Sequence, residues 1–189
     1  MRERTFTEQA RRTQLIDVTI ELVAEHGYPA TSLARIAESA GITKAAVLYH
    51  FPSKNALVEA AYAHVLTGLV TVVGTAVAAA APVDGPAAYV RSMVGHLREH
   101  PRHVRMIIEA MINVVPEAAS ADRWTAVADL LDQARAARGI KGPFDRRTAA
   151  LVIGGGIDAI VAESLTDPAY DTAAAADVLV TAIERAWLI

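Results

Sequence analysis

The sequence predicts an all-α fold of about nine helices. Apolar residues make up 53% of the 189 residues, so the chain can bury a core. Alanine is the commonest apolar residue, while Phe, Trp and Tyr together reach only 5%. Alanine favours close-packed helices, whereas strands favour β-branched and aromatic residues. Glycine and proline recur between apolar segments at positions that suit helix ends.

The first helix is predicted over residues 7–26. Leu15, Val18 and Leu22 lie at helical spacing and form one apolar face. Gly27 ends this helix, because glycine adopts the backbone conformation found just after a helix at the least cost.

A short second helix is predicted over 33–40. Thr31 or Ser32 can cap its N-terminus, since both side chains can accept a hydrogen bond from a free backbone N–H. Gly41 follows as the residue that closes the helix.

The third helix, 44–50, is capped by Thr43 and must end before Pro52, because proline forces the preceding residue out of helical geometry. Ser53 then caps a much longer helix over 54–79.

The segment AAAAPVDGPAA (78–88) is the clearest break in the chain. We expect an N-terminal domain over 1–52 and a C-terminal helical bundle over 53–189. The bundle continues with helices at about 87–99, 102–114, 119–138, 145–165 and 172–188.

Two short helices joined by a glycine-containing turn, with a helix before them, form a helix-turn-helix over 32–51. Ala37 is small enough to let the next helix approach, and Gly41 permits the turn. Ile42 and Val47 fill the angle between the helices. The N-terminal domain is therefore predicted to be a three-helix helix-turn-helix domain.

A helical wheel separates two faces of the third helix. The side predicted to be buried carries Val47, Leu48 and Phe51. The side predicted to face outward carries Ala45, Ala46, Tyr49 and His50. Small residues near the start allow close approach to the major groove, where an alanine methyl can touch a thymine methyl. Lys44 falls near the packed side, but its long stem can turn outward.

The segment TSLARIAESAGITKAAVLYHFPSKNAL (31–57) resembles the N-terminal part of TetR-type (TetR/AcrR-like) transcriptional regulators. It has the family's threonine before the second helix, its Ile-Ala pair, its Ala-Gly turn and its His-Phe-x-x-Lys ending. The resemblance covers about residues 15–60; beyond them, length and helix count agree. Ala45 stands where many members have glycine. Leu48 stands where many have tyrosine, which here comes one residue later.

This resemblance implies a cytoplasmic homodimer that binds a double-stranded DNA operator and releases it when a small-molecule effector enters the C-terminal domain. It also assigns DNA contacts to the positions that match the family, namely Thr31, Thr43, Lys44, Tyr49, His50 and Lys54. We add three neighbours on the two short helices, namely Ser32, Arg35 and Ala45.

Each DNA contact has a structural alternative. Lys54 can be an ordinary solvated lysine, and Arg35 can be a simple surface charge. Tyr49 can pack on the next helix, His50 can bond a backbone carbonyl, and Thr43 can serve only as a helix cap.

Net charge is −3, which by itself disfavours a polyanionic partner. The charge is uneven, however. Residues 1–60 hold seven Arg and Lys against seven Asp and Glu, and residues 31–54 hold three cations against Glu38 alone. The N-terminal 60 residues are neutral, with a basic segment, whereas the rest of the chain is acidic. This distribution is compatible with nucleic-acid binding at the N-terminal end.

No catalytic residue, metal site or cofactor is expected. The chain lacks cysteine, and residues 154–156 (GGG) lack the Lys-Ser/Thr of a phosphate loop. We interpret the glycines as a close helix crossing. His96 and His100 lie one turn apart, a spacing that could hold a metal. Histidines at a helix junction more often lie at a surface or line a pocket.

Five residues are candidates for ligand contact because their helices are expected to border a cavity; they are Met93, His96, Met106, Glu109 and Asn113. Core or surface packing explains each of them equally well.

A homodimer through the last two helices is predicted. The segment at 150–165 is apolar almost all round, so it needs partners on several sides. The final helix adds an apolar stripe, namely Ala175, Leu179, Ala182, Ile183, Ala186 and Trp187. With Asp158 and Glu163, the 150–165 segment falls short of a membrane span, and no signal core follows the N-terminus. No membrane partner is expected.

Two functions remain open. The first is a ligand-responsive DNA-binding repressor. The second is a helical enzyme or small-molecule carrier whose N-terminal helices only resemble a DNA-binding module. The absence of catalytic motifs and the outward Ala-Ala-Tyr-His face favour the first.

Overall fold

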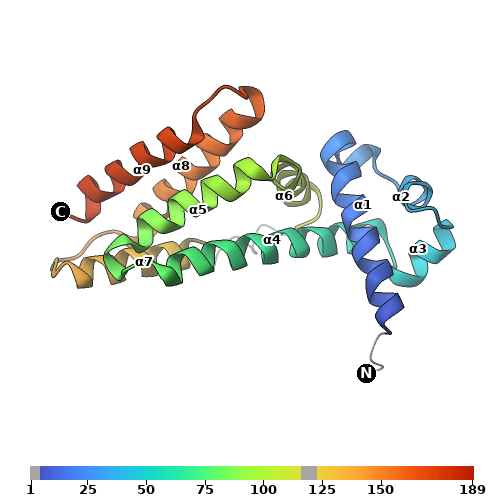
Figure 1. Cartoon of the computed structure of the whole chain (residues 1–189), viewed down its shortest axis with the longest axis horizontal. Helices are drawn as coiled ribbons and strands as arrows, with labels where there is room; N and C mark the ends of the chain where they lie inside the picture. Colours follow the sequence, from blue (N-terminus) through green and yellow to red (C-terminus); the bar gives the residue numbers. More distant parts are fainter. Residues whose placement is uncertain (1–4, 116–122) are drawn as a thin grey trace. The chain divides into compact units, whose positions relative to one another are not determined.

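The computed structural model describes residues 5–115 and 123–189, and every regular element in those ranges is a helix (Figure 1). The all-α prediction is confirmed. The elements are α1 (Phe6–Ala30), α2 (Leu33–Ser39), α3 (Lys44–His50), α4 (Lys54–Ala79), the 3-10 turn η1 (Pro82–Asp84), α5 (Gly85–Glu99), α6 (Pro101–Asn113), α7 (Arg123–Ala137), α8 (Arg146–Thr166) and α9 (Thr172–Trp187).

The predicted bounds of α3 and α4 agree with the structure. In α1, Gly27 has a φ of +77° and interrupts the helical geometry, so the regular part ends where the sequence predicts. A capping box begins α1, in which Thr5 and Glu8 bond each other's backbone N–H groups. The start of the helix expected at 119–138 lies outside the described residues. The turn η1 has no counterpart among the predicted elements.

The chain divides into two compact units, residues 1–67 with 102–116 and residues 68–101 with 117–189. Helix α4 contributes to both units, and α6 belongs to the first. The boundary predicted from sequence lies after residue 52, at the end of the helix-turn-helix, whereas the division between these two units falls within α4. The predicted boundary stays a prediction.

Helix α1 uses two faces to build the core of the first unit. One face places Leu15 against a cluster from α2, α3 and the start of α4, which includes Ile36, Val47 and Phe51. The other face contributes Ile20 and Val23, which pack in a second cluster with α4 and α6. Burial of both faces fixes α1 between the helix-turn-helix and α6.

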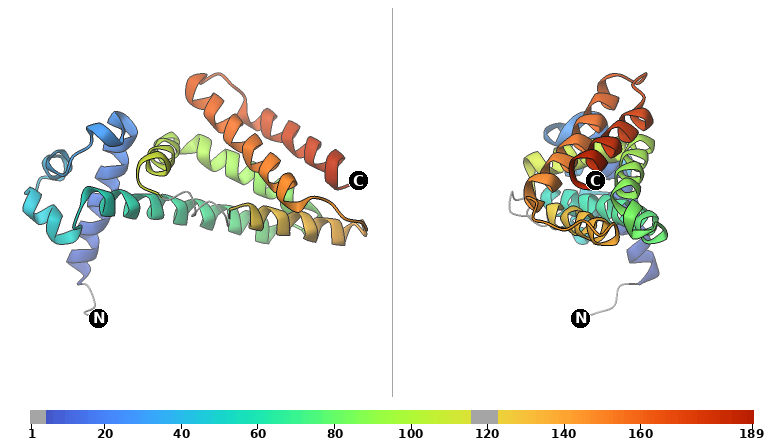
Figure 2. Two further views of the ribbon diagram at one scale, coloured as in Figure 1. Left: turned by 180° about the vertical axis from the view of Figure 1, so that it is seen from behind. Right: turned by 90° about the vertical axis from the view of Figure 1, so that its left-hand side faces the viewer.

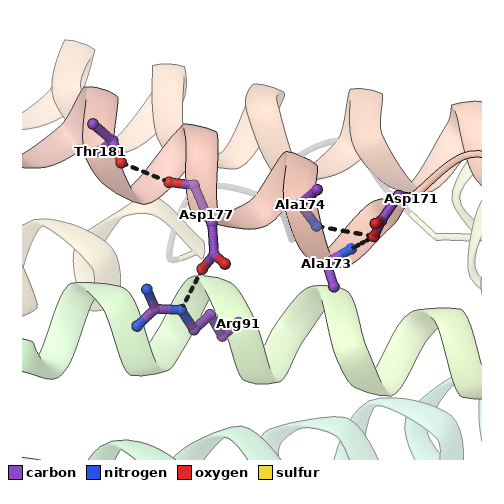
Figure 3. A network of polar contacts seen from close by, with 6 residues as sticks. All are labelled: Arg91, Asp171, Ala173, Ala174, Asp177 and Thr181. Carbon is purple, nitrogen blue, oxygen red and sulfur yellow. Dashed lines mark hydrogen bonds and ion pairs between the residues drawn. The ribbon is translucent and has the colours of Figure 1, made fainter.

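The second unit is built around α5, α8 and α9. Helices α8 and α9 run side by side in opposite directions in Figures 1 and 2, and α5 packs against both. Arg91 of α5 donates to Asp177 of α9 at 2.7 Å (Figure 3). In the same view, Asp171 caps α9 by accepting hydrogen bonds from the backbone N–H groups of residues 173 and 174.

The glycines at 154–156 have different surroundings. A Cβ added at Gly156 would lie 3.0 Å from a methyl carbon of Leu179, so α9 crosses close to α8 at this point. The close crossing inferred from sequence therefore holds at Gly156. A Cβ at Gly155 would meet none of the described atoms within 4 Å.

The end of α9 is held by two arginines of the α7 segment. Arg135 donates to the carbonyl of Trp187 at 2.6 Å, and Arg138 donates to the carbonyl of Leu188 at 3.0 Å. These carbonyls belong to the last turn of α9, where no backbone N–H group of the helix is available to bond them. The helix dipole also places partial negative charge at this end, which a cation stabilises.

Among the described residues, α4 and α8 are long and apolar enough to cross a membrane by length and composition alone. This corrects the expectation that the 150–165 segment falls short of a span, because α8 extends over Arg146–Thr166. Core helices of soluble proteins pass the same test, so the property does not identify a membrane protein.

Candidate nucleic-acid interface

Local features at three positions fix the two short helices. Ser32 accepts from the N–H of Arg35 at 3.2 Å and begins α2, and Thr43 accepts from the N–H of Ala46 at 3.2 Å and begins α3. Between them, Gly41 has a φ of +66°, which only glycine adopts readily. The local sequence therefore sets where each helix starts and how the chain turns.

The predicted packing of the helix-turn-helix is confirmed. Ala37 and Val47 are buried where α2 and α3 meet, and Ile42 packs against the same cluster from the turn. Phe51 is also buried, although it lies just beyond α3. This core leaves one face of α3 for solvent.

The exposed residues of α3 are Lys44, Ala45, Leu48 and Tyr49. Lys44 turns outward as expected. Leu48 does not follow the prediction of a buried residue, because 41% of it is exposed. It lies about 80° around the helix from the mean direction of Val47 and Phe51, on a flank that is open to solvent.

Tyr49 is 73% exposed, yet its hydroxyl donates to the carboxylate of Glu8 at 3.0 Å. Its ring also contacts the ring of His50 edge-on, with centroids 5.0 Å apart. Glu8 lies in the first turn of α1, so the start of α1 positions the tyrosine of α3.

A second bridge joins α1 to the end of α3. Arg12 donates to the backbone carbonyl of His50, and its guanidinium lies 3.9 Å from the centroid of the Phe51 ring. His50 itself is half-buried. Arg12 therefore satisfies a carbonyl at the end of a helix that Pro52 cuts short.

Among the predicted DNA contacts outside α3, Ser32, Arg35 and Thr43 are exposed. Thr31 is only 1% exposed, and its hydroxyl donates to the carbonyl of Gly27 at 2.9 Å. Thr31 thus closes the end of α1, where its side chain does not reach the surface. Ser32, and not Thr31, provides the cap of α2.

Lys54 is half-buried against Tyr28. Its ammonium donates to the backbone carbonyl of Tyr28 at 3.0 Å and lies 3.6 Å from the centroid of the ring. The hydroxyl of Tyr28 donates to Asn55 at 2.6 Å. The start of α4 is therefore anchored to the segment that follows Gly27.

The predicted ligand residues fall in two units. Met93 and His96 lie on α5 in the second unit, whereas Met106, Glu109 and Asn113 lie on α6 in the first. Met106 is fully buried in the core of its unit, and Asn113 donates to the carbonyl of Glu109 at 2.8 Å. Their role as ligand contacts stays a prediction.

The rings of His96 and His100 have centroids 4.4 Å apart. Burial, and secondarily the charge of His100, lowers the pKa of His96 below its ordinary value of 6.5. Over the described ranges, no group of three or more His, Asp or Glu is arranged to hold a metal ion.

Sequence reasoning missed three residues that position the interface, namely Glu8, Arg12 and Tyr28. The Thr-x-x-Glu pattern at 5–8 signals a capping box and could have identified Glu8 as part of the start of α1. Nothing in the sequence links Glu8 to Tyr49 or Arg12 to His50, because those pairs are 41 and 38 residues apart.

The family model of "Bacterial regulatory proteins, tetR family" matches residues 15–61. The HTH-type transcriptional regulator BetI of Burkholderia mallei (strain NCTC 10229) is 40% identical to the chain over 86 residues. That match covers 46% of this chain and 43% of BetI, so it spans less than half the length of the curated relative.

Two solved structures are similar over most of the chain. The TetR-family regulator PfmR of Thermus thermophilus has a TM-score of 0.75 and 21% identity, covering 90% of this chain and 97% of PfmR. FadR of Bacillus subtilis, solved with stearoyl-CoA, has a TM-score of 0.73 and 18% identity, covering 90% of this chain and 96% of FadR. At these identities the likeness shows the fold. Residues 15–61 therefore match the tetR-family segment, and the chain as a whole shares its fold with these two solved structures.

Proposed function

We propose that this protein is a ligand-responsive, DNA-binding transcriptional regulator, and most simply a repressor that leaves its operator when a small molecule binds. The observation that carries this proposal is the outward face of α3. That face combines Lys44 with Ala45 and Tyr49, and α3 has no acidic residue. The match of residues 15–61 to the tetR family supports it.

DNA contacts in this proposal divide into two kinds. Ala45 and Tyr49 face the major groove, where small and polar groups meet base edges. Arg35, Lys44 and Lys54 meet phosphates as cations, and such contacts position a protein without reading sequence. Ser32, Thr43 and His50 add polar groups around the same face. Thr31 is left out because it is buried.

The proposed regulator is a homodimer that pairs α8 and α9 with the same helices of a second copy. Leu151 and Val152 of α8 and Val178 of α9 are exposed, and a Cβ at Gly155 would meet none of the described atoms of its own chain. An apolar surface of this kind favours a partner. A two-fold axis also suits a palindromic operator read by two copies of α3.

Effector binding is proposed to change the spacing of the two recognition helices. Helix α4 carries Lys54 at its start and continues into the second unit, so a shift of that unit can move the helix-turn-helix. Half-sites on one DNA face lie about 34–36 Å apart, and a change of a few ångströms spoils simultaneous docking. The complex of FadR with stearoyl-CoA supports a small-molecule effector in this fold.

Operator and effector must then weaken each other's binding by the same factor, because thermodynamic coupling is reciprocal. An effector that bound equally well with and without saturating operator would exclude this release mechanism.

The proposed location is the cytoplasm, where operator DNA is accessible. The relatives reported above are likewise named transcriptional regulators.

A mobility-shift assay with the DNA that flanks the protein's own gene tests the proposed function. The wild-type protein should form a discrete complex that survives excess unrelated duplex. The double variant Arg35→Ala, Lys44→Ala should weaken binding to every duplex tested, because both side chains are proposed to contact phosphates. A matched double variant of exposed cations elsewhere, Lys141→Ala and Arg98→Ala, should bind as tightly as wild type. Equal binding by both double variants would contradict the proposed interface.

A further inference from the structure

Leu48 is the exception among the large aliphatic residues of the helix-turn-helix. Ile36 and Val47 are in the core, and Leu33 and Ile42 pack against it. Leu48 is 41% exposed, in the middle of a seven-residue helix. About two fifths of it is open to solvent, so its packing within the chain does not fully account for an apolar residue at this position.

The neighbours of Leu48 indicate what it meets. Lys44 precedes it by one helical turn and Ala45 by three residues, so all three share the exposed face. Tyr49, the other exposed large hydrophobic residue of α3, has its hydroxyl bonded to Glu8 on α1. Ala45 and Leu48 therefore form an apolar strip beside a cation, on a helix without acidic residues.

We infer that Leu48 reads the C5 methyl group of a thymine in the major groove. The inference rests on the proposed function, because it requires α3 to enter the groove. The thymine methyl is the one apolar group that a base presents there, and it distinguishes T·A from the other pairs. The side chain of Leu48 is longer than that of Ala45, so it reaches the thymine methyl group while Lys44 contacts the phosphates.

The test begins with sites selected by the full-length protein from a random duplex pool. Each thymine of the selected half-site is then replaced by deoxyuridine, which removes only the C5 methyl group. For wild type, one such replacement should weaken binding about fourfold for each half-site, as expected when a single methyl leaves an apolar contact. For Leu48→Ala, the same replacement should have little effect.

Two further variants make the test specific. Leu48→Gln should lose the preference for thymine at that position and favour adenine, which glutamine recognises through two hydrogen bonds. Ile112→Ala removes an apolar side chain that is 74% exposed on α6, and it should keep the full uracil penalty. Thermal melting checks that both Leu48 variants fold.

The outcomes separate the inference from the proposed function. Selection of a sequence whose uracil penalties are identical in wild type and Leu48→Ala overturns the role of Leu48 and leaves DNA binding intact. Failure to select any sequence, with no salt-dependent binding, overturns the proposed function and the inference together. A thymine-specific penalty that disappears in Leu48→Ala establishes the contact.

Discussion

The carboxylate of Glu109 on α6 accepts a hydrogen bond of 2.8 Å from the backbone N–H of Tyr28, at the point where α1 ends. The preceding residue, Gly27, has a positive φ, and a Cβ added there would lie 3.6 Å from the same carboxylate. Tyr28 in turn accepts a hydrogen bond from Lys54 at the start of α4. Three helices of the first unit therefore meet at one residue.

Glu109→Ala should destabilise the protein by about 1–3 kcal/mol, because it leaves the Tyr28 N–H without its acceptor in a partly buried position. Chemical denaturation measures the change. Glu59→Ala, at an exposed glutamate on α4 of the same unit, should change the free energy of unfolding by less than about 0.5 kcal/mol. Equal effects of the two variants would show that the Glu109 hydrogen bond contributes nothing to stability.

Lys54→Ala should weaken DNA binding and reduce the slope of log affinity against log salt by about one for each subunit. Lys54→Arg should retain the slope, since it keeps the charge. Effector affinity, once an effector is known, should not change with Lys54→Ala. The Tyr28 contacts imply some loss of stability as well, so both variants need melting curves. An unchanged salt slope for the alanine variant would assign Lys54 to structure alone.

Val178→Glu should convert a dimer into a monomer. Val178 is 71% exposed on α9 and borders a shallow depression together with Asp177, Ala182 and Arg185. A carboxylate buried there in the proposed dimer would lose its hydration without a designed partner. Light scattering at micromolar concentration should give twice the chain mass of 20.1 kDa for wild type and the single mass for the variant.

The control for this experiment is Ile112→Glu, which places the same charge on α6 at a side chain of similar exposure. It should leave the mass at the dimer value. A wild-type protein that is monomeric, or a Val178→Glu variant that stays dimeric, would be inconsistent with pairing through α8 and α9.

Stability should fall in mild acid because of His96. Its pKa is lowered in the folded state by burial and then by the charge of His100, so the unfolded chain binds the proton more readily. This contribution to stability is complete above the ordinary pKa of 6.5 and is lost as the pH falls from there through the lowered pKa of the folded state. His96→Gln should therefore show a smaller loss of melting temperature than wild type on acidification from about pH 7.5 to about pH 5.5. A steeper loss of melting temperature in His96→Gln than in wild type would contradict the predicted direction of the effect.

The sequence predicts best those features that depend on neighbouring residues. The bounds of α3 follow from the Thr43 cap and from Pro52, which act locally. The burial of Ala37 and Val47 follows from the spacing that any helix-turn-helix requires. The prediction for Leu48 is wrong because a helical wheel identifies the centre of a face but not which flank the neighbouring helices leave open.

The remaining features depend on contacts between distant parts of the chain. The bridges Glu8–Tyr49 and Arg12–His50 require a particular rotation of α1 against α3, and apolar periodicity does not fix that rotation. The placement of α6 is a second case. Its Met106 packs in the core of the first unit, whereas α5, the preceding helix, belongs to the second. Pro101 marks the boundary between these helices, but a proline does not tell which unit each one joins.

The most direct test of the central claim is the affinity for a selected DNA site, measured by fluorescence anisotropy between about 50 and 200 mM salt. The account predicts binding at least about 10³-fold tighter than to a scrambled duplex, and a steep fall of affinity with salt. It also predicts that Arg35→Ala with Lys44→Ala flattens this fall. Equal affinity for selected and scrambled duplexes, with no dependence on salt, would contradict a DNA-binding role for the outward face of α3.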